Sequence, residues 1–95
     1  MRKYELLYVL QPDLDEEQMQ ALKEKVNGII AEQSGQNVEV NEWGKRRLAY
    51  EIADHREGHY IEVHFEGTPQ VVDELERVIK ITNGILRHII VRIEK

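Results

Sequence analysis

Lys45, Arg46 and Arg47 place three basic side chains in a row, two residues after Trp43, the only tryptophan of the chain. Lysine and arginine neutralise phosphate, so this run is a candidate contact with an RNA backbone. A second interpretation is that these charges protect the edge of a sheet from pairing with another sheet. Regular strand alternation predicts Lys45 and Arg47 on one face, and Arg46 on the other with its stem along the core edge.

The charges of the chain are segregated. The 95 residues carry 18 acidic and 13 basic side chains, a net charge of −5. Acidic side chains predominate between residues 13 and 32, whereas basic side chains gather elsewhere. The basic groups are Arg2 and Lys3, then Lys45, Arg46 and Arg47, then Arg87, Arg92 and Lys95. Because charges more than about 8–10 Å apart are screened at cellular salt, a local basic patch can still bind an anion.

Residues suited to catalysis or metal binding are few. Ser34 is the only serine and no nucleophile-elbow motif surrounds it, while the chain has no cysteine. His59 and His64 fall on opposite faces of one predicted strand, so they are poorly placed to share a metal. Asp13, Asp15 and Glu17 are spaced like the start of a calcium loop, but the sixth position of that loop lacks the required glycine. We therefore predict no catalytic residue, metal, cofactor or small-molecule substrate.

The first half of the chain reads as strand, helix, strand. Lys3–Leu10 is rich in Tyr, Leu and Val, which predicts a central strand. From Leu14 to the plausible stop at Gly35, apolar residues follow helical spacing, and Asp15 with Gln18 or Asp13 with Glu16 could cap the start. Val38–Ala53 is a second extended stretch, with a bulge or bend expected at Gly44. The apolar stripe of the helix consists of Met19, Leu22, Val26, Ile29 and Ile30.

The second half repeats this order. Asp54–Gly58 reads as a hairpin loop, and His59–Glu66 alternates cleanly as a strand. Thr68-Pro69 opens a second helix that Asn83-Gly84 ends, and Ile85–Ile93 is the last strand. The result is an α+β, ferredoxin-like βαββαβ fold, with two helices on one face of a four-stranded antiparallel sheet. We expect one domain over residues 1–95, with the first and third strands at the centre.

The sheet face away from the helices is the second candidate surface. An RNA-recognition motif of this topology needs aromatic residues there on the first and third strands, where only Tyr60 qualifies by alternation, while Glu62 and Glu66 repel phosphate. A protein partner fits better, because the pattern predicts an apolar strip flanked by charges, although half-apolar sheet faces are ordinary. The strip is expected to contain Leu7, Val9, Leu86 and Ile90, with His88 and Arg92 beside the last two.

Several stretches of the chain resemble bacterial small-subunit ribosomal protein six. The most specific is "WGKRRLAYEIA" at Trp43–Ala53. The others are "RKYE" at Arg2–Glu5, "PDLDEE" at Pro12–Glu17, "GHYIEVHFEGTP" at Gly58–Pro69 and "ELERVIKITNGILRHIIVR" at Glu74–Arg92. The resemblance covers almost the whole chain, and the fold of that family agrees with the predicted element order.

The resemblance implies a structural role and no enzymatic activity. Members bind the central domain of small-subunit rRNA, on the platform, as a pair with small-subunit ribosomal protein eighteen. By match with the family, the candidate residues for RNA or partner binding are Arg2, Lys3, Tyr4, Lys45, Arg46, Arg47, Tyr50, Arg87 and Arg92. The implied location is cytoplasmic and ribosome-associated, in keeping with the absence of a recognisable signal peptide or membrane span.

Two other functions fit the predicted topology. One is a homodimeric module that senses a small molecule at its interface, and the other is a small degradative monooxygenase. The enzyme reading is weakened because the sequence offers no clear polar cluster in the sheet cleft.

Overall fold

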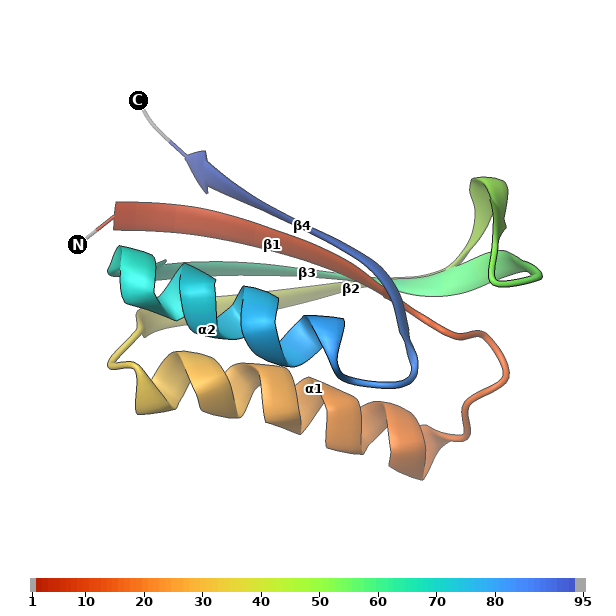
Figure 1. The fold of residues 1–95 in the computed structure, drawn as a ribbon, viewed down its shortest axis with the longest axis horizontal. Helices are drawn as coiled ribbons and strands as arrows, with labels where there is room; N and C mark the ends of the chain where they lie inside the picture. Colours follow the sequence, from red (N-terminus) through yellow and green to blue (C-terminus); the bar gives the residue numbers. More distant parts are fainter. Residues whose placement is uncertain (1, 94–95) are drawn as a thin grey trace.

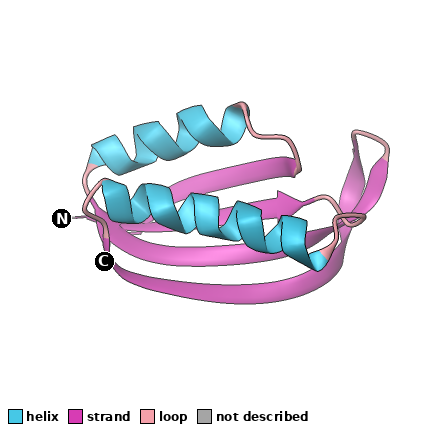
Figure 2. Cartoon of the chain, turned by 90° about the horizontal axis from the view of Figure 1, so that it is seen from below, coloured by secondary structure: helices cyan, strands magenta, loops and turns pink. Residues whose placement is uncertain are grey.

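The computed structural model describes residues 2–93, except the side chain of Asn37. The elements are β1 (Arg2–Leu10), α1 (Glu16–Glu32), β2 (Gln36–Ile52), β3 (His55–Gly67), α2 (Pro69–Lys80) and β4 (Ile85–Ile93). The strands form one antiparallel sheet in the order β2-β3-β1-β4, and both helices cover the same face (Figures 1 and 2). The predicted ferredoxin-like fold, with β1 and β3 at the centre, is confirmed.

The core lies between the helices and the sheet. Tyr4, Leu6, Tyr8 and Leu10 of β1 point into it, and Tyr4 stacks on Phe65 of β3 with ring centroids 5.6 Å apart. The helices contribute the expected stripes, with Val26, Ile29 and Ile30 from α1 and Val71, Leu75 and Ile79 from α2. The alternate residues of β1 and β3 therefore face away from the helices. We call this side of the sheet the open face.

The helix ends follow the local sequence. At α1, the Asp15 carboxylate accepts from the Gln18 backbone N–H at 2.7 Å, and the Gln18 side chain accepts from the Asp15 N–H at 3.1 Å. This capping box is one of the two predicted. Thr68 and Pro69 begin α2 as predicted. Within residues 2–93, neither helix has both the length and the apolar character needed to cross a membrane.

The β2–β3 hairpin has a shorter turn than predicted. Both strands continue to a two-residue turn, Ala53-Asp54, whose φ angles are +49° and +67°. Positive φ at both central positions is typical of a type I′ turn, whose twist matches that of the flanking strands. Asp54–Gly58 is therefore not a loop. The extended hairpin passes beyond the helices and bends away from them (Figure 1).

The faces of β4 are the reverse of those predicted. Leu10 pairs with Ile85 and Val9 with Arg87, so Leu86 is an extra residue that shifts the alternation. The Nε2 atom of His88 lies 2.9 Å from a carboxylate oxygen of Glu76 in α2, so His88 points toward the helices. Ile90 packs against the core and Arg92 pairs with Tyr4 on the same side. The open face of β4 instead carries Arg87, Ile89, Val91 and Ile93.

Candidate nucleic-acid and partner interface

A bulge in β2 sets the geometry of the basic run. Glu42 pairs with Ile61 and Gly44 with Tyr60, so Trp43 is the extra residue. Gly44 has a φ of +82°, a conformation that costs a residue with a Cβ atom about 1–2 kcal/mol. The sequence therefore correctly predicts an irregularity at Gly44.

The bulge reverses the faces of the basic residues. After it, Lys45 pairs with His59, Arg46 with Gly58 and Arg47 with Glu57. Because His59 lies on the same side of β3 as the buried Ile61, Lys45 and Arg47 lie on that side too, and Arg46 lies on the open face. The predicted assignment is therefore wrong, because an inserted residue shifts the alternation by one.

The same bulge places Trp43 against Tyr60 on the open face. The two rings are stacked at an interplanar angle of 4°, with centroids 5.8 Å apart. The sequence analysis considered aromatic residues only on the first and third strands, where Tyr60 alone qualifies, so it did not consider Trp43 of the second strand. The signal that could have found it is the alternation itself, because Trp43 lies two residues before Lys45, which was predicted on the open face.

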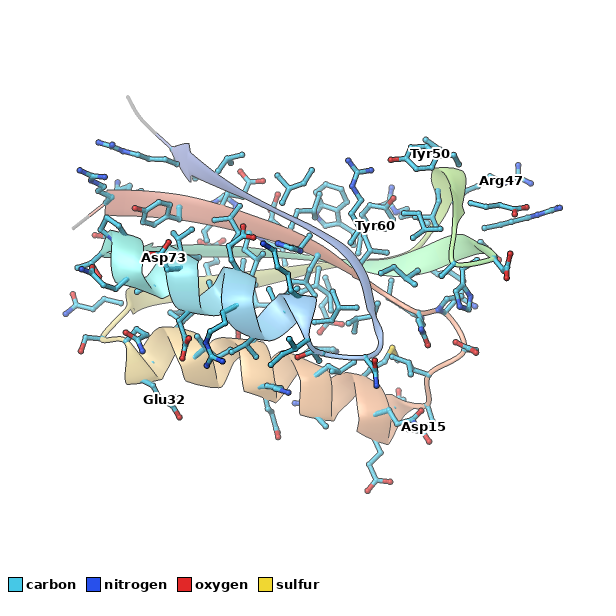
Figure 3. All side chains as sticks on the ribbon, viewed as in Figure 1. Asp15, Glu32, Arg47, Tyr50, Tyr60 and Asp73 are labelled. Carbon is cyan, nitrogen blue, oxygen red and sulfur yellow. The ribbon has the colours of Figure 1, made fainter. Side chains whose placement is uncertain are left out.

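One group of predicted residues gathers around the projecting hairpin. We call Lys45, Arg46, Arg47, Tyr50 and Arg87 the hairpin cluster. All five are exposed. Arg46 Nε donates to the Trp43 carbonyl at 3.3 Å, which fixes its guanidinium beside the bulge. Tyr50 is 62 % exposed, and its hydroxyl accepts from Arg87 Nη1 at 3.4 Å, so the hairpin contacts β4. Tyr50 and Arg47 lie on the outer part of the hairpin (Figure 3).

The remaining predicted residues lie at the other end of the sheet. Lys3 pairs with Ile93 and Tyr4 with Arg92, which places Arg2, Lys3 and Arg92 at one end of the sheet as a terminal cluster. Lys3 lies on the open face, and Arg2 and Arg92 lie on the side of the helices. The cluster is about 20 Å from Arg87 along the strands, at roughly 3.4 Å per residue. Tyr4 is buried in the core, where its ring packs on Phe65 and is not available to a partner.

An acidic group separates the two clusters. On the open face, Glu5 of β1 lies beside Glu62 and His64 of β3, and one ligand atom of each lies within 4.8 Å of the other two. We call these three residues the central triad. Among residues 2–93, the triad is the one group of three or more acidic and histidine side chains close enough to share a cation. The sequence prediction considered a histidine pair and the acidic spacing from Asp13 to Glu17, and it did not identify the triad.

The two carboxyl groups of the triad titrate differently. The pKa of Glu5 is raised, first by burial and then by the hydrogen bond and negative charge of Glu62. Burial opposes ionisation of Glu62 too, but hydrogen bonds from His64 and Glu5 and the nearby His64 charge outweigh it, so the pKa of Glu62 is lowered. His64 Nε2 lies 3.2 Å from Glu62 Oε1, and Asn41 Nδ2 donates to the same oxygen at 3.4 Å.

Apolar side chains flank the triad along β4. Ile89, Val91 and Ile93 are 43 %, 46 % and 37 % exposed on the open face. We call them the apolar row. The predicted strip was different, because Val9 is buried and Ile90 points to the helices. An exposed apolar surface beside an acidic centre is nevertheless the kind of surface expected for a basic protein partner.

The chain is similar to known proteins over nearly its full length. The family model described as ribosomal protein S6 matches residues 3–92. Small ribosomal subunit protein bS6 of Moorella thermoacetica is 47 % identical over 95 residues, which cover 100 % of this chain and 97 % of that protein. The bS6 protein of Desulforudis audaxviator is 50 % identical over 92 residues, covering 97 % and 98 %. The crystal structure of 30S ribosomal protein S6 from Thermotoga maritima superposes with a TM-score of 0.91 at 34 % identity, covering 97 % of this chain and 87 % of that one.

Proposed function

The chain belongs to the ribosomal protein S6 family of the small ribosomal subunit, and from this premise we propose that it binds the central domain of small-subunit rRNA as a pair with small-subunit ribosomal protein eighteen. Its relatives are named as ribosomal proteins, so the chain is a structural component and not an enzyme. Its location is ribosome-associated, and we propose that this is in the cytoplasm.

The separation of the hairpin cluster from the central triad carries the proposal. The hairpin cluster projects four cations, Lys45, Arg46, Arg47 and Arg87, at one end of the sheet, away from the central triad. Phosphate contacts require such a local cationic surface, and a net charge of −5 does not prevent them because distant charges are screened.

The central triad and the apolar row support a basic protein partner. Carboxylates at Glu5 and Glu62 attract cationic side chains, and Ile89, Val91 and Ile93 offer apolar area to bury. A basic partner on this surface would also cover the negative charge of the central triad. It would add phosphate contacts of its own, so the chain alone should bind RNA weakly.

The direct test measures how RNA binding depends on salt. The pair is titrated with a central-domain rRNA fragment at several salt concentrations, using wild type and the double variant Arg46→Ala, Arg47→Ala. Each lost phosphate contact should reduce the slope of log K against log salt by about 0.7–0.9. The control is Lys25→Ala, Lys80→Ala, which removes two exposed cations from the helices. An unchanged slope in the first variant would assign Arg46 and Arg47 to structure.

Sedimentation of cell extract distinguishes the broader alternatives. The chain is expected in small-subunit particles together with a basic protein. Recovery as a homodimer that holds a small molecule would instead favour a sensing module or a monooxygenase. If the isolated chain bound the rRNA fragment as tightly as the pair does, the proposed division of labour between the two proteins would be wrong.

A further inference from the structure

The Trp43–Tyr60 stack is a preformed aromatic surface that is partly exposed to solvent. Trp43 is 40 % exposed and Tyr60 is half-buried, so the indole remains open to solvent although Tyr60 packs against it. Both side chains come from strands, and the bulge at Gly44 fixes their approach. A rigid aromatic surface loses little conformational entropy when a ligand binds, which favours stacking of a planar group.

Two cations, Arg46 and Arg87, share the open face with this stack. Arg46 lies on the same face, and its Nε atom bonds to the Trp43 carbonyl. In Figure 3, Tyr60 lies at the base of the projecting hairpin, whose outer part carries Arg47 and Tyr50, the residue that contacts Arg87. Trp43 belongs to β2, an edge strand, and not to the acidic centre of the sheet. These neighbours suit a nucleotide, with its planar base and anionic phosphate, better than a basic peptide.

We propose that the Trp43–Tyr60 stack receives one unpaired base of the rRNA while the hairpin cluster contacts the adjoining phosphates. This inference rests on the proposed RNA binding and assigns a base contact within it. RNA is recognised mainly where unstacked bases can stack on aromatic side chains, and each such contact contributes about 1–3 kcal/mol. The contact is tolerant of sequence, because every base presents a planar face.

Trp43 reports on its own contact, since it is the only tryptophan of the chain. The wild-type pair is titrated with the central-domain rRNA fragment, and the pair containing Trp43→Phe supplies the background signal of the partner. Stacking of a base should quench the Trp43 fluorescence in parallel with RNA binding. The signal comes from the wild-type chain, and only the background requires a variant, which keeps an aromatic ring at position 43.

Affinity measurements give a second, independent readout. Trp43→Leu should weaken RNA binding about 5- to 150-fold, which is the stacking free energy expressed as a ratio of binding constants. Trp43→Phe, which keeps an aromatic face, should lose less RNA affinity than Trp43→Leu. The salt slope should stay at the wild-type value in both variants, because neither removes a cation, in contrast to Arg46→Ala, Arg47→Ala.

The outcomes separate this inference from the proposed function. If the wild-type pair binds RNA, but Trp43 fluorescence does not change and Trp43→Leu binds equally well, the base contact is wrong and RNA binding stands. If the partner protein alone changes the fluorescence and RNA adds nothing, the stack belongs to the protein interface and the inference is again overturned. If the wild-type pair does not bind the fragment at all, the proposed function itself fails.

Discussion

Glu5 and Glu62 hydrogen-bond to one another across the two central strands of the open face, with His64 beside Glu62. The charges that shift their pKa values are their own and that of His64. Among the cross-strand neighbours, Asn41 and Val91 are uncharged, while Glu39 of β2 pairs with His64. The result is one carboxyl group that resists ionisation and one that favours it. As pH rises, ionisation of Glu5 therefore lowers the stability of the chain, whereas ionisation of Glu62 raises it.

Glu5→Gln is expected to stabilise the chain at neutral pH. The substitution removes a like charge from a cross-strand neighbour, which is worth about 0.2–1 kcal/mol. Because the pKa of Glu5 is raised by folding, its contribution to stability is present below its unfolded pKa and is lost as pH rises through its folded pKa. The gain of the variant over wild type should therefore grow from pH 3 to pH 7, as measured by urea unfolding at each pH.

Glu62→Gln is the matched control for that measurement. The pKa of Glu62 is lowered by folding, so its contribution is present above its unfolded pKa and is lost as pH falls through its folded pKa. This variant should be less stable than wild type at pH 7, with a difference that shrinks toward pH 3. Two results would contradict a raised pKa at Glu5 and a lowered pKa at Glu62. One is a loss of stability in Glu5→Gln at pH 7, and the other is a stability difference from wild type that does not vary with pH in either variant.

Gly44→Ala should destabilise the chain through its backbone alone. A Cβ atom at Gly44 would have no atom within 4 Å, so packing does not oppose it, but the φ of +82° costs about 1–2 kcal/mol for a residue other than glycine. Gly28→Ala is the control, because that position is equally open but lies within α1. There the change should stabilise by about 0.5–1 kcal/mol. Urea unfolding should move in opposite directions for the two variants, and a shift in the same direction would show that strain at Gly44 is not the cause.

The order of the elements and the helix faces could be predicted from the sequence, because each depends on a local period. The spacing of Val26, Ile29 and Ile30 is a property of α1 itself and needs no partner to be recognised. The capping box of Asp15 and Gln18 is equally local, since both ends of each hydrogen bond lie within four consecutive residues.

The faces of the edge strands could not be predicted in this way. Alternation identifies a face only while no residue is inserted, and both edge strands contain an insertion. Trp43 shifts β2 and Leu86 shifts β4, which reverses the predicted positions of Arg46 and of His88. Whether a glycine such as Gly44 bends the strand or adds a residue depends on the pairing with β3. That pairing is a long-range property, which no local pattern contains.

Asp15→Ala tests the capping box of α1, which the sequence predicted and the structure confirms. The substitution leaves the Gln18 backbone N–H without its acceptor at 2.7 Å and removes a negative charge near the positive end of the α1 dipole. The free energy of unfolding should fall by about 1 kcal/mol. Asp13→Ala removes the same charge two residues earlier, in the turn before the helix, and should change stability by less than about 0.5 kcal/mol. Urea unfolding of both variants, followed by circular dichroism, separates the two effects. Equal losses would mean that net charge near the helix, and not the cap, stabilises α1.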